Sequence, residues 1–256
     1  LGLPPARFSY GGKKDKHGLT SQFITIQDTR DFSARGKDFS LESRGFMDRP
    51  MAPRLVQGNA FTVTIRDLIE TKPLEANLKE VRKSGFPNFF DDQRFRSYDP
   101  ERGFFAEKIL KRHWNGALQV FLTSAGSDDS RAERERKAAL FKNWKDRPLL
   151  LTLASGPLET AVFGLLSCHP KNPGRALPLL PPEEVSMRYA AYQSHLWNDL
   201  LRRLIRLKVG SPDEVPGREA GYLFWKELNP EIFAYLGSLE IPTAAVKMTF
   251  SDELVR

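Results

Sequence analysis

The sequence is poor in cysteine and contains no long hydrophobic run. Cys168 is the single cysteine among 256 residues, which excludes a disulfide framework and a cysteine-built zinc site. The histidines are far apart, and none forms an HxxxH or HExxH pair. No run of about 18 apolar residues could span a bilayer, and the first residues lack the basic-then-apolar pattern of a signal peptide. We therefore expect a cytoplasmic protein without metal or cofactor.

Positive charge is in excess and is concentrated in two short stretches. The chain has 39 Lys and Arg against 32 Asp and Glu, a net charge of +7 and a pI of about 9.5. Residues 1–22 contain four basic residues and one acidic, and residues 188–209 contain five basic and one acidic. Such an excess favours an anionic partner, with nucleic acid first. The alternative is an ordinary basic protein with a solvated charged face.

The hydrophobic pattern mixes strands and helices without strict alternation, which predicts an α+β fold. β-Branched and aromatic residues predict a strand at 22–27, and a period-two pattern predicts one at 59–66; short strands and turns follow from residue 210. A proline-rich stretch at 170–183 is typical of a linker. The predicted helices cover 75–84, 104–110, 114–122, 128–144, 159–166 and 189–209. Because the chain begins with Leu and ends directly after a strand-like run, we interpret it as a fragment of a longer protein.

The first candidate for chemistry is the segment GGKKDKHGLTSQ at residues 11–22. Asp15 lies between Lys14 and Lys16, and adjacent cations lower the pKa of a carboxyl group. Such a carboxylate is a poor general base, but it suits a nucleophile or an anionic partner for a developing cation. The alternative is a surface turn. The segment matches neither the phosphate-binding G-x-x-x-x-G-K-[ST] pattern nor K-x-D-G.

The second candidate is the stretch GFPNFFDDQRF at residues 85–95, which is too polar for a core strand. Asn88 and Gln93 can read the edge of a base, Phe90 can stack on it, and Arg94 can bind phosphate. The alternative is a turn whose phenylalanines fill the core. We assign two of them to the core: Phe86 and Phe95.

The third candidate is the segment AYQSHLWN at residues 191–198, at the start of the strongest predicted helix. Its polar residues Gln193, Ser194 and Asn198 cannot all lie on the apolar face. Ser194 and Asn198 are four residues apart and share a face. We interpret them as polar residues that cap or cross a packed helix.

Together these segments resemble the TruD family of pseudouridine synthases. The resemblance covers about residues 10–209 and weakens beyond them. Two residues depart from the family pattern, because Asp91 and Arg96 stand where it has glycine, and the local turn is therefore in question. The family's patterns G-x-K-D-(K/R)-x-x-x-T-x-Q, G-N-x-F, G-x-P-N-(Y/F)-F-G-x-Q-R-F-G and A-Y-Q-S-x-L-(F/W)-N fall at residues 12–22, 58–61, 85–96 and 191–198.

The resemblance implies the conversion of a uridine in RNA to pseudouridine, without metal or cofactor. The family substrate is transfer RNA, with position 13 of the D-arm the bacterial and archaeal target, and the base would be flipped out of its stack. By position, Asp15 would be the catalytic aspartate, acting as a nucleophile or by abstracting a sugar proton. Phe90 would stack on the uracil, and Asn88 would orient the aspartate loop or the base. The remaining substrate-binding candidates are Lys14, Lys16, Gln93 and Arg94.

The implied architecture is a mixed or antiparallel sheet flanked by helices. Residues 1–187 would form an incomplete catalytic domain, and residues 188–256 would begin the family's inserted domain. We expect a monomer. The rival hypothesis is a non-catalytic RNA-binding module that keeps the basic patches, and a carboxylate in a basic loop argues against it. A hydrolase that uses Asp15 lacks a partner base in the sequence. The arginines of 202–206 either contact phosphate or form a solvated face.

Overall fold

The computed structural model describes residues 3–14, 18–27, 33–126, 129–239 and 241. Its contacts divide the chain into two compact units, Leu1–Ile69 and Glu70–Arg256. Helices and small antiparallel sheets occur together, so the α+β prediction is confirmed. The described strands form three separate two-stranded sheets and not the one larger sheet that the resemblance implied.

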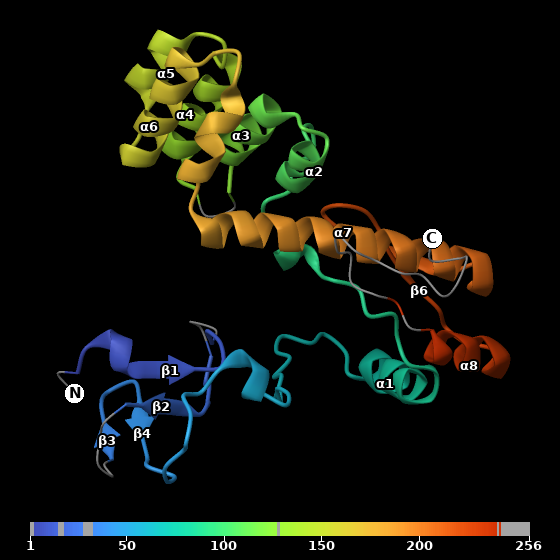
Figure 1. The fold of residues 1–256 in the computed structure, drawn as a ribbon. Coiled ribbons are helices and arrows are strands. Elements are labelled where there is room, and N and C mark those ends of the chain that lie inside the picture. Colours follow the sequence, from blue (N-terminus) through green and yellow to red (C-terminus); the bar gives the residue numbers. More distant parts are fainter. Residues whose placement is uncertain (1–2, 15–17, 28–32, 127–128, 240, 242–256) are drawn as a thin grey trace. The chain divides into compact units, whose positions relative to one another are not determined.

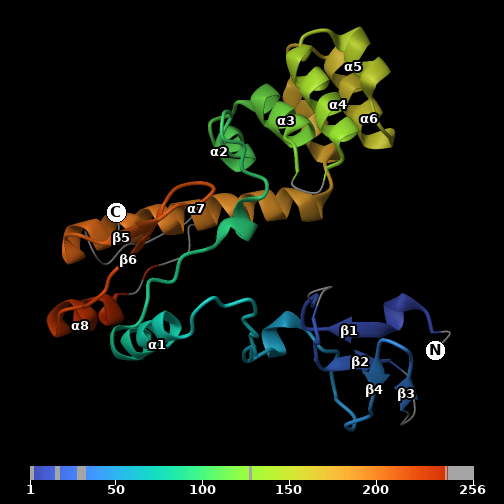
Figure 2. The same ribbon diagram turned by 180° about the vertical axis from the view of Figure 1, so that it is seen from behind.

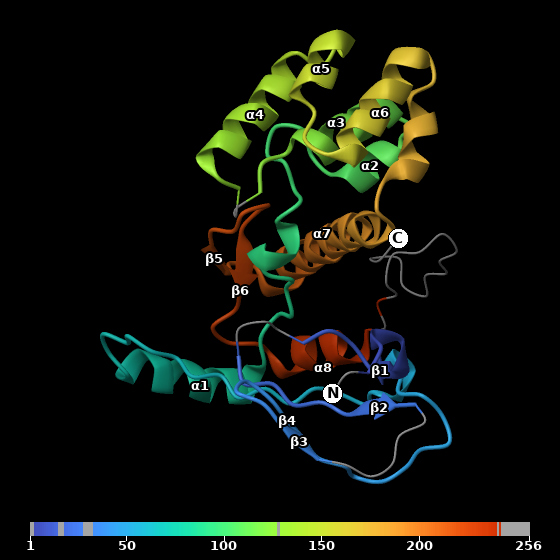
Figure 3. The ribbon, with the colours of Figure 1, turned by 90° about the vertical axis from the view of Figure 1, so that its left-hand side faces the viewer.

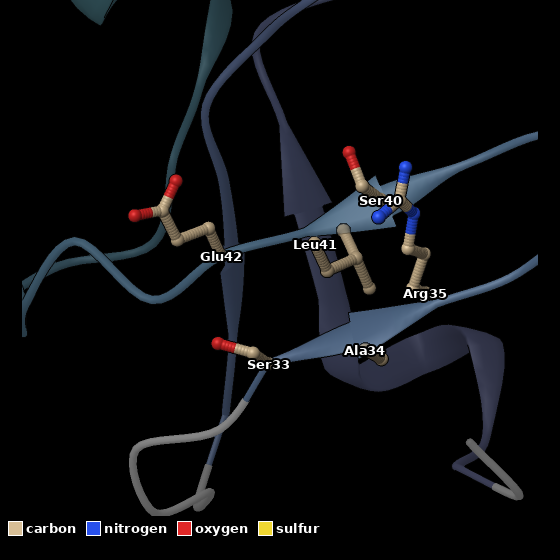
Figure 4. Close-up of a pocket in the computed structure, with 6 residues that line it drawn as sticks. All are labelled: Ser33, Ala34, Arg35, Ser40, Leu41 and Glu42. Carbon is tan, nitrogen blue, oxygen red and sulfur yellow. The ribbon is translucent and has the colours of Figure 1, made fainter.

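The first unit contains two short antiparallel strand pairs (Figure 1). Strand β1 (Phe8–Tyr10) pairs with β2 (Ile24–Ile26), which confirms the strand predicted at 22–27. Strand β3 (Ala34–Arg35) pairs with β4 (Ser40–Leu41). A shallow hollow lies over this second pair, and its lining is made of short side chains with Arg35 and Glu42 at the ends of the strands (Figure 4). None of the candidate site residues lines this hollow.

The prediction of a strand at residues 59–66 is wrong. The segment forms no strand, and its apolar side chains Phe61, Val63 and Ile65 are 79%, 77% and 56% exposed. Alternating apolar and polar residues give a segment the capacity to bury one face, but a strand also needs a hydrogen-bonded neighbour. No described strand of this unit pairs with residues 59–66.

The second unit is mainly helical (Figures 1 and 2). The six helices that were predicted are present, with ends within a few residues of the expected ones except at the start of α7. Two further helices, α5 and α8, were not predicted. The helices are α1 (Lys72–Ser84), α2 (Phe105–Leu110), α3 (Trp114–Thr123), α4 (Arg131–Lys142), α5 (Arg147–Leu153), α6 (Pro157–Cys168), α7 (Pro182–Val209) and α8 (Pro230–Ser238).

Local sequence signals account for several of the helix ends. Helix α1 ends at Gly85, whose φ of +64° is a conformation that glycine adopts without steric cost. Helix α4 begins after Ser130, whose side chain accepts a hydrogen bond from the Glu133 amide. The 28-residue helix α7 begins with Pro182 and has acidic residues in its first turn and basic residues in its last, both favourable to the helix dipole.

Helices α3 to α6 gather around one hydrophobic core at one end of α7 (Figures 1 and 2). Leu118, Leu140 and Phe163 are fully buried there. The stretch predicted as a linker at 170–183 belongs to this core. It forms a 3-10 helix, Pro173–Leu179, that packs against α3 and α6 and buries Ala176. Proline prevents a regular α-helix here but leaves apolar side chains free to pack.

Helix α7 connects this core to the remaining elements of the second unit. It contacts α2, a 3-10 helix at Asp92–Phe95 and strand β6 (Tyr222–Phe224), which pairs with β5 (Asp213–Val215) beside it (Figure 3). The division into domains at residues 187 and 188 stays a proposal, and that boundary falls inside α7. Among the described residues, no helix combines the length and apolar character needed to cross a membrane.

Candidate functional site

The segment Asn88–Phe90 is held against α7 by its backbone. The Phe90 amide donates to Asn198 Oδ1 at 2.9 Å, and Asn198 Nδ2 donates to the Phe90 carbonyl at 2.8 Å. One residue earlier on the helix, Trp197 Nε1 donates to the Asn88 carbonyl at 2.9 Å. Asn198 is completely buried. Two consecutive residues of α7 therefore bind both ends of a three-residue segment that lies more than 100 positions earlier in the chain.

This attachment directs the side chains of the segment to different sides. Phe89 points inward, with ring centroids 5.6 Å from Tyr222 and 6.3 Å from Phe224. Asn88 is exposed, and Phe90 is 38% exposed. The structure thus presents an amide and an aromatic ring to solvent on a backbone that is itself fixed, which is the arrangement that base recognition requires.

The other candidates from this stretch lie beside Phe90. Gln93 and Arg94 belong to the 3-10 helix that follows and are exposed. The guanidinium carbon of Arg94 is 5.3 Å from the centre of the Phe90 ring, a cation–π distance. Arg94 therefore covers part of one face of the ring, in addition to the phosphate contact predicted from its charge.

The two phenylalanines assigned to the core have different outcomes. Phe95 is fully buried, as predicted, against Phe104 at a centroid distance of 6.4 Å. Phe86 was wrongly placed in the core, because its side chain is 60% exposed. Gly85 turns the chain immediately before it, and Pro87 is the buried residue of this turn instead.

The two residues that replace family glycines do not disturb the turn. Asp91 has φ of −81° and ψ of 167°, and Arg96 has φ of −58° and ψ of −29°. Both lie in regions open to any residue. The Asp91 side chain also accepts a hydrogen bond from the Asp92 amide at 2.8 Å and begins the 3-10 helix. The glycines of the pattern are therefore not needed for this backbone.

The hairpin β5–β6 supports the same stretch from the other side. Asp92 accepts hydrogen bonds from the Tyr222 hydroxyl and the Arg218 amide, both at 2.7 Å. These hydrogen bonds lower the pKa of Asp92. Burial, and then the bond to Asp92, raise the pKa of Tyr222. A charged carboxylate and a neutral phenol therefore persist at neutral pH, and they tie the hairpin to the 3-10 helix.

A buried ionic cluster attaches the hairpin to α7. Glu219 bonds His195 Nδ1 at 2.5 Å and Arg202 Nη1 at 3.2 Å, and the Glu219 and Arg202 side chains are 7% and 5% exposed. Burial opposes ionisation of Glu219, but the bonds from His195 and Arg202 outweigh it, so the pKa of Glu219 is lowered. The arginines of 202–206 were expected either to contact phosphate or to form a solvated face, and the buried, paired Arg202 fits neither expectation. Arg203 and Arg206 are exposed.

The Asp15 loop belongs to the first unit. Asp15 and Lys16 lie outside the described residues. Lys14 is exposed, and its Nζ donates to Asn59 Oδ1 at 2.9 Å. This bond joins the first candidate segment to the G-N-x-F segment. The structure therefore groups Asn88, Phe90, Gln93 and Arg94 in one unit and Lys14 in the other. Among the described residues no three His, Cys, Asp or Glu side chains are placed to hold a metal ion.

Sequence reasoning missed the residues that hold the site together. Asn198 was interpreted as a polar residue that caps or crosses a packed helix, and no role at the site was predicted for Trp197. Glu219 and Tyr222 were not singled out. One signal was available for Asn198, since an amide in line with apolar residues of a buried helix needs a partner. The identity of that partner depends on tertiary structure.

The second unit thus fixes an exposed amide and an exposed aromatic side chain against α7, and comparison with known proteins identifies the family of the chain. The family model described as tRNA pseudouridine synthase D (TruD) matches residues 1–219, so the chain belongs to the TruD family. A crystal structure of a putative tRNA pseudouridine synthase D from Methanosarcina mazei is 25% identical, with a TM-score of 0.63 over 82% of this chain and 50% of that one.

Curated relatives match nearly the whole chain but extend beyond it. A probable tRNA pseudouridine synthase D 2 from Methanocaldococcus jannaschii is 29% identical over 98% of this chain and 61% of its own length. A tRNA pseudouridine synthase D from Aquifex aeolicus is 28% identical over 96% of this chain and 65% of its own length. The chain thus spans less than two thirds of the length of these relatives.

Proposed function

We propose that this chain is part of an isomerase that converts a uridine of transfer RNA to pseudouridine. The observation that carries the proposal is the segment Asn88–Phe90, whose backbone is fixed to α7 while its amide and aromatic side chains face solvent. Membership of the TruD family supports the reaction. We place the target at position 13 of the D-arm, following the family resemblance.

The reaction breaks the bond between N1 of the base and C1′ of the ribose and forms a bond from C5 to C1′. The hydrogen at C5 leaves as a proton, and N1 gains one, so no redox equivalent is consumed. The target base must leave its stack before it can react. We assign the Phe90 ring to stacking on the flipped uracil and Asn88 to hydrogen bonding near it.

We assign the catalytic carboxylate to Asp15. Its neighbours Lys14 and Lys16 favour the ionised form, which suits attack on the sugar carbon and also suits abstraction of a sugar proton. Lys14, Lys16 and Arg94 are candidates for phosphate contacts because of their positive charge. Such contacts fix the register of the RNA without reading its sequence. Gln93 is a further candidate for a base contact.

The test is release of tritium from tRNA transcribed with [5-³H]uridine, because the C5 hydrogen is lost in the reaction. The protein in its full reading frame is compared with Asp15→Asn and with Asp38→Asn, an exposed carboxylate of the same unit. We expect release by the wild type and Asp38→Asn and none by Asp15→Asn, with tRNA affinity nearly unchanged. Tight tRNA binding without release by any of the three would favour a binding module.

A further inference from the structure

We propose that Asn198 is a positioning residue, whose amide fixes the direction in which the Phe90 ring faces the RNA. The proposal rests on the proposed function in one respect, namely that this ring stacks on the target base. The carboxamide uses both of its ends on one residue. Its oxygen accepts from the Phe90 N–H at 2.9 Å, and its nitrogen donates to the Phe90 C=O at 2.8 Å.

This double contact resembles the pairing of one residue with another across an antiparallel sheet. Both backbone groups of Phe90 are held, so the peptide planes on each side of its Cα are held as well. The direction of the Cα–Cβ bond of Phe90 follows from those planes, and this residue is 38% exposed. We call this pair of hydrogen bonds between the Asn198 amide and the Phe90 backbone the clamp. The clamp acts on the backbone of Phe90 and thereby sets the direction of its side chain.

The neighbouring contacts leave the segment little freedom to rotate. Trp197 Nε1 holds the Asn88 carbonyl at 2.9 Å, and Phe89 packs on the inner side against Tyr222. Asn198 itself is 0% exposed, so a side chain one methylene longer has no space. Few residues offer an acceptor and a donor at this size, and asparagine is the one that matches a backbone N–H and C=O together.

The substitution Asn198→Leu tests the clamp, because leucine has the same number and branching of side-chain heavy atoms and neither hydrogen-bonding group. The matched control is Ser194→Ala. Ser194 lies one turn earlier on the same face, is 4% exposed, and donates only within the helix, to the Ala190 carbonyl at 2.8 Å. Both substitutions remove a buried polar group from α7, but only Asn198→Leu releases the Phe90 backbone.

The first measurement is hydrogen exchange of the Phe90 amide, which does not depend on activity. We expect exchange at least about tenfold faster in Asn198→Leu than in the wild type and in Ser194→Ala. Equal exchange in the two variants would overturn the clamp. Should Asn198→Leu fail to fold, Asn198→Ala removes the same two hydrogen bonds without adding volume, and it should speed exchange of the Phe90 amide in the same way. Unchanged exchange in Asn198→Ala would then overturn the proposal.

The second measurement is a double-mutant cycle with Phe90→Ala, read as the single-turnover rate on tRNA. We expect Asn198→Leu to lower the single-turnover rate about tenfold or more in the wild-type background, and by less than about twofold in the Phe90→Ala background. Equal slowing in both backgrounds would overturn the positioning role. Normal turnover by Phe90→Ala would instead refute the stacking role proposed above, and the exchange result alone would then decide whether the clamp exists.

Discussion

Replacing Glu219 by glutamine should destabilise the second unit strongly, although Glu219 lies outside the candidate site. Its carboxylate joins the β5–β6 hairpin to α7 through His195 and Arg202, and the Glu219 and Arg202 side chains are 7% and 5% exposed. Glutamine keeps the size of the side chain and removes its charge. Among the described residues, the buried Arg202 guanidinium would then keep one carboxylate partner, Asp199, which is 3.9 Å away and has a side chain that is 38% exposed.

The magnitude follows from the cost of an unpaired buried charge. Removing one partner of a buried ion pair costs about 3–5 kcal/mol, and the remaining Asp199 places this case at the lower end, about 3 kcal/mol. With a urea dependence of about 2 kcal/mol/M, the midpoint of unfolding should fall by about 1.5 M. Tryptophan fluorescence reports the transition, because all four tryptophans lie in the second unit and one of them, Trp225, follows β6 and donates from Nε1 to the Ser84 carbonyl at 3.1 Å.

The same substitution predicts a dependence on pH. Folding lowers the pKa of Glu219 from its ordinary value of 4.5, so the stabilisation is complete above pH 4.5 and is lost as the pH falls through the lower folded value. The difference between wild type and Glu219→Gln should therefore shrink below pH 4.5. Glu227→Gln, an exposed carboxylate of the same unit, is the control. Equal urea midpoints for Glu219→Gln and Glu227→Gln at pH 7 would refute the reasoning.

Three further predictions concern RNA binding and helix stability. Phe90→Ala should weaken productive tRNA binding by about 1–3 kcal/mol in a filter-binding or single-turnover assay, whereas Phe86→Ala, an exposed ring of the same stretch, should change it little. Removing the exposed pair Arg203 and Arg206 should reduce the slope of log affinity against log salt concentration by about one to two; an unchanged slope would assign both to a solvated face. Ser130→Ala should cost about 1 kcal/mol in thermal denaturation, because it removes the N-cap of α4.

The helices were predictable because their signals are local. Apolar spacing and a terminal glycine placed α1 and most of α7 within a few residues. The segment 59–66 failed for the opposite reason. Its alternating apolar and polar residues are compatible with a strand, but a strand also needs a hydrogen-bonded neighbour, and no local pattern specifies that neighbour. The proline-rich stretch at 170–183 was misjudged because proline signals the end of regular structure and says nothing about burial.

In the candidate site, too, some residues could be selected from local sequence and others only from tertiary contacts. Residue types alone selected Asn88 and Phe90, which the structure presents to solvent, and both stay predictions as RNA contacts. The buried residues that hold this part of the unit together depend on contacts across 108 positions for Asn198 and 17 positions for Glu219. Counting charges along the sequence overstates the positive charge of residues 188–209, because Arg202 is paired with Glu219, which lies outside that range.

Mapping of pseudouridine in a single tRNA tests the central claim most directly. The unmodified transcript is incubated with the wild-type protein in its full reading frame or with Asp15→Asn, treated with carbodiimide, and read by reverse transcription. The account predicts one new stop, one nucleotide 3′ of position 13 of the D-arm, with the wild type and none with Asp15→Asn. A transcript that is bound by the wild type and yet shows no new stop at any uridine would contradict it.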